Sequence, residues 1–532
     1  MLTRRHFLAA SAAVSSISCM SLSEAIAATP KTVLVVAQQL DNMTSLDPHE
    51  SFEALGGEII GNMYQQLVTP NRENPDEVLP QIAESWTASD DGKTFTFKIK
   101  HGLKFSSGAE VTSEDCAYSM QRAVSLNKSP AFIITQFGWN ADNAKDLIVA
   151  QDADTLVLKT TAPTAIGFLL YCLSANVACV VEKKVVEANA QNGDWGNAWL
   201  QKNSAGSGPF TLKTWRPSDT IVLELNPNGL YKGNLKRITL RHIVDPSAQL
   251  LMLQKGDADI ARNLTSEQLR TLEGAKDVVL VRKAIASLML LSLNLANDNL
   301  KNPKVWEAVK WAIDYDGIQK NILSMTHEVH QSIVPKGLPG AVNDTPFHKD
   351  SAKAKALLAE AGYPDGFEIE LDHYSAQPYP DIAQTIQANL GEIGIKVKLI
   401  AGENRQVLTK MRARGHQMAL SSWGTDYFDP NANTDVFCIN ADNSDNATTK
   451  PFAWRSSFKD DKIMAMAIAA RDEKDPATRI KLFEELQRYF MDNSPFPILF
   501  QGSVTAACAP DVKGVELGVL PNDNSYQGTT KA

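Results

Sequence analysis

The sequence predicts a mixed α/β protein of two or three domains, and three observations support this fold class. Its 532 residues exceed what one hydrophobic core normally covers, roughly 250 to 300 residues. A composition of 44% hydrophobic and 21% charged residues is that of a globular chain and excludes disorder and collagen. Apolar residues at 367–399 alternate, then follow helical spacing, then alternate again, which predicts a βαβ unit with a right-handed crossover.

The N-terminus predicts export from the cytoplasm. Arg4 and Arg5 precede an apolar stretch, and small residues up to Ala27 offer a cleavage site. This pattern is typical of a twin-arginine signal, and a buried first helix is the alternative interpretation. A lipoprotein site at Cys19 is disfavoured because Ser16 stands where such sites normally have a leucine. We therefore expect a periplasmic protein that has lost its signal peptide.

The charge and hydropathy of the remaining chain exclude two classes of partner. The formal net charge of the whole sequence is −9 and no basic stripe is present, so a nucleic-acid partner is not expected. Beyond the signal, no stretch approaches the ~18 apolar residues that a membrane span needs. We expect no direct membrane insertion, and membrane contact only through a partner protein.

The cysteines point to neither a metal centre nor a redox site. The chain has six, and one of them, Cys19, lies in the signal. The odd number that remains leaves at least one thiol free, and no CxxC spacing is present. Cys172 and Cys179 are the candidate disulfide pair. We expect no cofactor.

The first part of the chain has both strand and helix patterns. A strand is expected at 33–37, and a helix at 59–68, where apolar residues follow helical spacing. Residues 94–100 alternate strictly, as a half-buried strand does. Thr112 can cap the helix that follows, whose apolar positions lie on one side.

Five segments of this region also match a known family. They are Leu79–Trp86, the Asp90-Asp91-Gly92 turn, Phe95 with Phe97, Gly102–Phe105 and Thr112–Ser119. Together they resemble the signature of the bacterial extracellular solute-binding proteins of family five, the dipeptide, oligopeptide and nickel type that serves ABC importers. Roughly forty residues match without a gap, so the resemblance is more specific than a short motif.

The resemblance continues along the chain. Gly206–Phe210 and Asn226-Pro227 resemble the family's return into its first domain, and Val305–Asp314 and Ala354–Gly366 resemble two of its helices. Residues 228–233 depart from the family, which usually has an aromatic pair after the Asn-Pro. The departure concerns the local loop and not the family.

The resemblance implies a two-lobed periplasmic binding protein of the cluster C type, with three domains around a ligand cleft and a hinge. It assigns 1–27 to the signal, 59–204 to an inserted subdomain of the first lobe and 283–495 to the second lobe. The first lobe is discontinuous and consists of 28–58, 205–282 and 496–532. The implied function is capture of a solute by hinge closure and delivery to an ABC permease in the inner membrane. We expect a monomer.

The second half of the chain leads to the candidate site. A helix is expected at 404–414 and a strand at 417–421; later, a helix at 478–491 precedes a strand that starts within 494–500. In α/β sheets, ligands bind outside the carboxyl ends of the strands. Trp423–Pro430 follows such an end and holds three aromatics and two carboxylates. This stretch predicts the mouth of a binding site, with an ordinary surface loop as the alternative.

Asp426 is the first candidate for ligand contact. A carboxylate that loses water in a closing cleft needs a positive partner with hydrogen bonds, and a ligand ammonium provides both. In the peptide-binding members of the family that the chain resembles, the Asp three residues after the Trp of this motif holds the α-amino group. Trp423 and Asp426 have this spacing. Trp423, Tyr427 and Phe428 could form the walls of the site or belong to the core.

Three residues outside this stretch complete the expected site. Tyr374 lies just beyond the end of the neighbouring predicted strand. Arg405 and Arg455 are the basic residues first considered for a ligand carboxylate, although such residues are more often ordinary surface charges. Asp429 is expected to cap the loop or to bind nothing.

No catalytic constellation is present. GxSxG, GxGxxG and GxxxxGK[ST] motifs are missing, and His327 and His330 are three residues apart instead of the four in HExxH. A solvated helix end is preferred there over a loose metal site. We therefore expect no enzyme, but a binding protein for a short peptide or another amine-bearing solute. A metal chelate is the alternative if His373 or His416 faces the cleft, an opine-like or sugar-like solute is another, and an extracellular hydrolase is the rival class.

Overall fold

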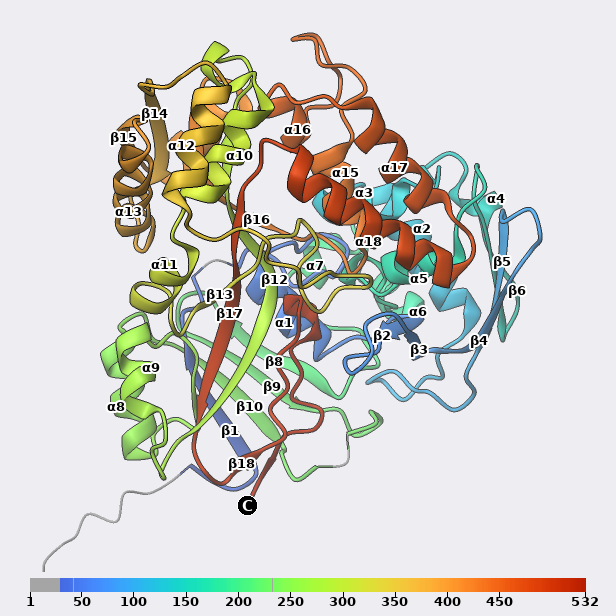
Figure 1. Cartoon of the computed structure of the whole chain (residues 1–532). Helices are drawn as coiled ribbons and strands as arrows, with labels where there is room; N and C mark the ends of the chain where they lie inside the picture. Colours follow the sequence, from blue (N-terminus) through green and yellow to red (C-terminus); the bar gives the residue numbers. More distant parts are fainter. Residues whose placement is uncertain (1–28, 42, 232) are drawn as a thin grey trace, which may run out of the picture.

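The computed structural model describes residues 29–41, 43–231 and 233–532 (Figure 1). The expected export signal lies outside the described residues. None of the described helices is long and apolar enough to cross a membrane.

One eleven-stranded sheet runs through the molecule. Its strand order is β15-β14-β16-β12-β17-β11-β1-β10-β9-β8, and β13 pairs with β17 off this path. The bounds are β1 Val33–Gln38, β8 Phe210–Arg216, β9 Thr220–Leu225, β10 Arg237–His242, β11 Ile260–Ala261, β12 Val279–Leu293, β13 His327–Val329, β14 Glu368–Tyr374, β15 Lys396–Gly402, β16 Met418–Gly424 and β17 Ile498–Cys508.

The long strands β12 and β17 join the two ends of this sheet. We call the part with β1 and β8–β11 the first lobe and the part with β14–β16 the second lobe (Figure 1). β12 pairs with β16 of the second lobe and with β17, whose far end pairs with β11 of the first lobe. The register between β12 and β17 shifts between Ala284 and Leu288. Such an irregularity interrupts the ladder and bends the strands.

The predicted βαβ unit is confirmed in the second lobe. β14 and β15 are parallel neighbours, with Glu368 opposite Lys396, and α13 (Tyr379–Glu392) connects them. After α14 (Asn404–Arg412), β16 returns parallel to β14. The carboxyl ends of these strands therefore lie at one edge of the sheet. The other second-lobe helices are α10 Pro303–Ala312, α11 Tyr315–Asn321, α12 Ser351–Glu360, α15 Asn431–Cys438, α16 Phe452–Arg455, α17 Asp461–Asp472 and α18 Pro476–Asn493.

A separate four-stranded sheet, in the order β4-β5-β7-β6, lies in the chain between β1 and β8. Phe95 and Phe97 are fully buried on one face of β5. Thr112 and Asp115 form a capping box, which confirms the predicted start of α2. The bounds are β4 Ala83–Ala88, β5 Thr94–Ile99, β6 Ile148–Asp152, β7 Thr155–Lys159, α2 Ser113–Leu126, α3 Phe132–Thr135, α4 Ala144–Leu147, α5 Ile166–Leu173, α6 Lys183–Ala188 and α7 Asn197–Leu200.

The smaller elements complete the fold. In the first lobe, α8 contacts β1 and β11, and α9 follows it in the chain (Figure 1). The bounds are β2 Val68–Pro70, β3 Val78–Pro80, α8 Pro246–Lys255, α9 Ser266–Leu272, β18 Val512–Lys513 and β19 Thr530–Lys531.

The helix expected at 59–68 is wrong in its position. The helix α1 spans Ala54–Gly61, and the chain then leaves helical geometry. The carbonyl of Met63 accepts a hydrogen bond from the backbone N of Gly208 at 2.9 Å. A Cβ at Gly208 would meet the Met63 backbone at 2.4 Å, so glycine permits this close approach. The apolar pattern at 59–68 therefore reflects a buried segment that becomes irregular after Gly61.

The expected Cys172–Cys179 pair is also wrong. All five cysteines among the described residues are buried and unpaired. Cys172 packs in the core of the four-stranded sheet, whereas Cys179 packs in the core of the first lobe. The two thiols therefore belong to different hydrophobic clusters despite their short separation in the sequence.

Candidate functional site

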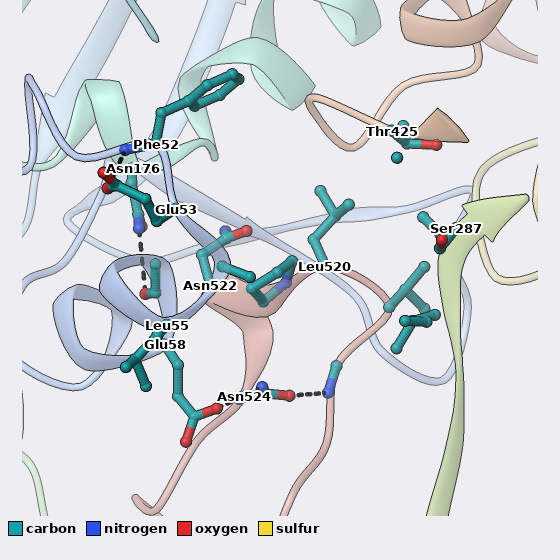
Figure 2. A pocket seen from close by; sticks show the side chains of 18 of the residues that line it. Phe52, Glu53, Leu55, Glu58, Asn176, Ser287, Thr425, Leu520, Asn522 and Asn524 are labelled. Carbon is teal, nitrogen blue, oxygen red and sulfur yellow. Dashed lines mark hydrogen bonds between the residues drawn. The ribbon is translucent and has the colours of Figure 1, made fainter. Parts of the chain in front are cut away.

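A cavity of about 560 Å3 lies between the two lobes, and we call it the interlobe cavity (Figure 2). Its volume is within the usual range for small-molecule sites, about 300 to 1,000 Å3. The first lobe contributes the start of α1 and residues 262–263, and the second lobe contributes Gly424–Asp426 at the end of β16. β12 and β17 contribute Ile285, Ser287 and Val504, next to the shifted register. A ligand in this cavity would touch both lobes and their connection.

The loop 518–524 forms a further wall of the interlobe cavity. Leu520 and Asn522 project from it toward the cavity (Figure 2). Asn524 donates a hydrogen bond from Nδ2 to Glu58 at 2.9 Å, which ties this loop to α1. The lining is thus assembled from segments that are far apart in the sequence.

Asp426 lines the interlobe cavity as a half-buried carboxylate. Within the described ranges it has neither a hydrogen-bond donor nor an ion-pair partner, and loss of water raises its pKa to about 6. The neighbouring backbone is fixed, because Thr425 N donates to Ala286 O on β12 at 2.9 Å. A positioned carboxylate without a partner is suited to a cationic group of a ligand.

The three aromatic residues of this stretch do not line the interlobe cavity. Trp423 packs edge-on against Phe437 and Phe452, with ring centroids 5.9 and 5.8 Å apart. Tyr427 and Phe428 are each 4% exposed. Their rings face α5 instead, with Phe168 6.3 Å from Tyr427 and Tyr171 5.9 Å from Phe428. Tyr427 and Phe428 therefore pack the second lobe against the chain segment that contains the smaller sheet.

The other predicted site residues also lie away from the cavity lining. Tyr374 is 3% exposed and packs against Tyr379, with ring centroids 4.7 Å apart. Arg405 is exposed on α14. Arg455 is half-buried on α16, with its guanidinium 5.5 Å from the ring centroid of Phe452. The structure brings none of the three together with Asp426 in this cavity.

Asp429 has a structural environment that the sequence did not reveal. Its carboxylate accepts two hydrogen bonds from the Arg479 guanidinium, at 2.8 and 2.9 Å, and both side chains are buried. It also accepts from the backbone N of Asn431 at 2.8 Å, which agrees with the expected capping role. The partner Arg479 lies on α18, fifty residues away, and no local motif marks it.

The histidines among the described residues do not form a metal site. His373 and His416 are buried and do not line the interlobe cavity; their ring nitrogens contact Tyr374 O and Ser292 Oγ, both at 2.9 Å. His327 lies on β13, so the expected helix end is wrong. In the part of the chain that the structure describes, no group of three or more His, Cys, Asp or Glu could hold a metal.

Sequence reasoning missed the first-lobe wall of the cavity. Phe52 and Glu53 precede α1, and Asn176 lies near them (Figure 2). Phe52 and Glu53 belong to an irregular segment and Asn176 begins a short 3-10 helix, and neither segment has periodicity or a motif. The one available signal was Phe52, an aromatic residue beside an acid, and such a pair is common on ordinary surfaces.

A sheet that spans two lobes, with a ligand-sized cavity beside the strands that connect them, defines the class of two-lobed solute-binding proteins. The family model "Bacterial extracellular solute-binding proteins, family 5 Middle" matches residues 77–445. The chain belongs to this family. The members bind solutes for ABC importers and are not enzymes, which confirms the expected class and the expected lack of catalysis.

Individual relatives agree with this assignment. The probable D,D-dipeptide-binding periplasmic protein DdpA of Escherichia coli K12 is 29% identical over 496 residues, which cover 92% of each chain. The glutathione-binding protein GsiB of Salmonella choleraesuis is 26% identical over 92% of this chain and 94% of its own.

Solved structures confirm the two-lobed fold. The periplasmic binding protein DppA of Helicobacter pylori, in complex with the peptide STSA, has a TM-score of 0.73 at 26% identity and covers 94% of this chain and 98% of its own. NikZ of Campylobacter jejuni, in complex with Ni(L-His), has a TM-score of 0.73 at 20% identity, with coverage of 94% and 100%, and shows the fold alone.

Proposed function

We propose that this protein captures a short peptide or another amine-bearing solute in the interlobe cavity and delivers it to an ABC permease. The observation that carries the proposal is Asp426, a half-buried carboxylate without a partner among the described residues, whose pKa is raised to about 6 by loss of water. A ligand ammonium would restore the interactions that this carboxylate has lost. The relatives named for dipeptide and glutathione binding support a peptide-like ligand.

Hinge closure is part of the proposal. The cavity is lined by both lobes and by β12 and β17, whose ladder is interrupted between Ala284 and Leu288. A ligand that contacts both lobes stabilises the closed arrangement through its higher affinity for that state. We expect each lobe to move as a unit, with the domain boundaries predicted from the sequence and the second lobe at 283–495.

We also propose that the protein acts in the periplasm as a monomer and reaches it by the twin-arginine route. The paired arginines support the route, and the periplasmic relative DdpA supports the location. Replacing Arg4 and Arg5 by lysine should leave the uncleaved precursor in the cytoplasm. Normal export of that variant would contradict the route.

Calorimetry on Asp426→Asn tests the binding function. Loss of one charge-assisted contact should weaken binding of a ligand with a free amino group by about 1.5 to 3 kcal/mol. The ligand is first identified by native mass spectrometry of protein purified from the periplasm. Asp435→Asn is the matched control, because Asp435 lies on α15 and does not line the cavity. Unchanged affinity in Asp426→Asn would remove this residue from the site.

A further inference from the structure

Four charged side chains line the interlobe cavity, and only two of them form an ion pair with each other. The four are Glu53, Glu58, Arg262 and Asp426. Arg262 donates to Glu58 at 3.0 Å, and both side chains of this pair are buried. Asn524 and Tyr526 also donate to Glu58, at 2.9 and 2.8 Å. Because Arg262 is already matched by a well-bonded carboxylate, its positive charge is neutralised within the protein.

Glu53 is the second acid of the lining without a cationic partner. Its carboxylate accepts hydrogen bonds from Thr44 Oγ1 at 2.5 Å, Phe52 N at 3.2 Å and Ser51 Oγ at 3.3 Å. All three donors are neutral, and within the described chain no Lys, Arg or His forms an ion pair with it. These bonds hold the carboxylate beside the Phe52 backbone (Figure 2), and none of them neutralises its negative charge.

Glu53 and Asp426 come from different lobes, because Glu53 precedes α1 and Asp426 follows β16. Phe52 and Glu53 lie on one wall, and Thr425, the residue before Asp426, lies on the opposite wall (Figure 2). The Phe52 ring is 45% exposed and lines the cavity beside Glu53. An aromatic face next to a carboxylate favours a cation. Apolar residues also line the cavity, and they include Ile285, Val504, Val519 and Leu520.

We propose that the interlobe cavity is specific for a ligand with two cationic groups separated by an apolar stretch, one bound by Asp426 and the other by Glu53 and Phe52. This inference rests on the proposed function, which assigns one ammonium to Asp426. A peptide with a free N-terminus and a lysine or arginine side chain has this chemistry. The ligand needs no carboxylate, because the lining offers no unpaired cation among the described residues.

The arrangement also couples the second cation to lobe closure. Glu53 belongs to the segment that leads into α1, which packs in the same core as β1, whereas Asp426 follows β16 of the second lobe. A dication that reaches both acids gains its second contact only when the lobes are close. Such a ligand therefore has a larger differential affinity for the closed state than a monocation.

The test compares two dipeptide amides that differ by one ammonium, lysyl-alanine amide and norleucyl-alanine amide. In calorimetry with the ligand-free protein, we expect the lysyl probe to bind about 10-fold to 100-fold more tightly. Glu53→Gln should reduce this ratio to near one, and Glu53→Asp should restore part of it. Glu73→Gln is the matched control, because Glu73 is an exposed acid outside this cavity.

The outcomes separate this inference from the proposed function. If Asp426→Asn weakens both probes but Glu53→Gln leaves their ratio unchanged, the dication inference is overturned and the proposed function stands. If Asp426→Asn affects neither probe, the assignment of the ligand ammonium to Asp426 in the proposed function fails. Lysyl-alanine with a free carboxylate should bind no more tightly than its amide, and a tenfold gain would overturn the claim that the ligand needs no carboxylate. Failure of the lysyl probe to bind at millimolar concentration would also overturn the inference.

Discussion

Asp426 and Asp429 lie three residues apart in one loop, yet their surroundings are opposite. Asp429 is fully buried and its charge is matched by two hydrogen bonds from Arg479. Asp426 is half-buried at the cavity wall and has no partner in the described part of the chain. The charge of Asp429, which the protein neutralises with Arg479, stabilises the fold. A charge that the protein leaves unmatched remains available for a ligand.

The largest expected effect is on the buried pair. Asp429→Ala leaves the Arg479 guanidinium buried without its carboxylate, which should lower the free energy of unfolding by about 3 to 5 kcal/mol. Urea denaturation followed by circular dichroism measures this change. The control is Asp344→Ala, which breaks an exposed pair with Arg488 and should cost less than about 1 kcal/mol. Equal losses of unfolding free energy in the two variants would contradict the distinction between the buried and the exposed pair. If Asp429→Ala does not fold, the milder Asp429→Asn takes its place.

The second prediction concerns the pH dependence of Asp426. Its pKa of about 6 in the ligand-free protein means that the carboxylate is mostly protonated at pH 5. An amine ligand should therefore bind roughly tenfold more weakly at pH 5 than at pH 7.5. Asp426→Asn should bind with a flat profile across this range. A wild-type profile that is equally flat would contradict the assignment.

The same shift has a consequence for stability with a defined sign. The pKa of Asp426 is raised in the folded state above its ordinary value of 3.8, so the folded state binds the proton more strongly than the unfolded state. The contribution of Asp426 to wild-type stability should decrease as the pH rises from about 4 to above 6, by an amount on the order of 1 kcal/mol because the side chain remains partly hydrated. Thermal unfolding of Asp426→Asn should lack this decrease.

The smallest expected effect concerns Tyr427, which lies between the two acids. Asn431 Nδ2 donates to its hydroxyl at 3.2 Å in a buried setting. Tyr427→Phe removes this acceptor and should cost about 1 kcal/mol of stability. Ligand affinity should not change, because Tyr427 does not line the interlobe cavity. A tenfold loss of affinity in calorimetry would show that the hydroxyl contacts the ligand.

The local features of the fold were readable from the sequence because their patterns arise from neighbouring residues. The alternation after Phe367 predicted the βαβ unit, and Thr112 predicted the start of α2. The apolar pattern of 59–68 failed because burial alone, without helical hydrogen bonds, also produces apolar runs. Met63 is held instead by a backbone contact with Gly208, and no rule based on spacing contains that contact.

The candidate site was readable in part for the same reason. Asp426 follows a parallel strand, and its position relative to Trp423 resembles a family motif, so the sequence could place it at the cavity. Tyr427 and Phe428 have their partners Phe168 and Tyr171 on α5, more than two hundred residues earlier in the chain, so their burial depends on tertiary packing. Glu53 carries no signal of its own, because only the assembled lobes show that it lines a cavity.

The loop 518–524 has a consequence for the time at which this protein can first bind its ligand. Phe52 on one wall is synthesised long before Leu520 on another, and at ordinary elongation rates the interval is on the order of tens of seconds. During that interval the earlier segments can fold, but the cavity lacks a wall. A nascent chain therefore has no complete binding site during synthesis. Solutes of the cytoplasm can bind in the complete cavity only after translation has passed residue 524.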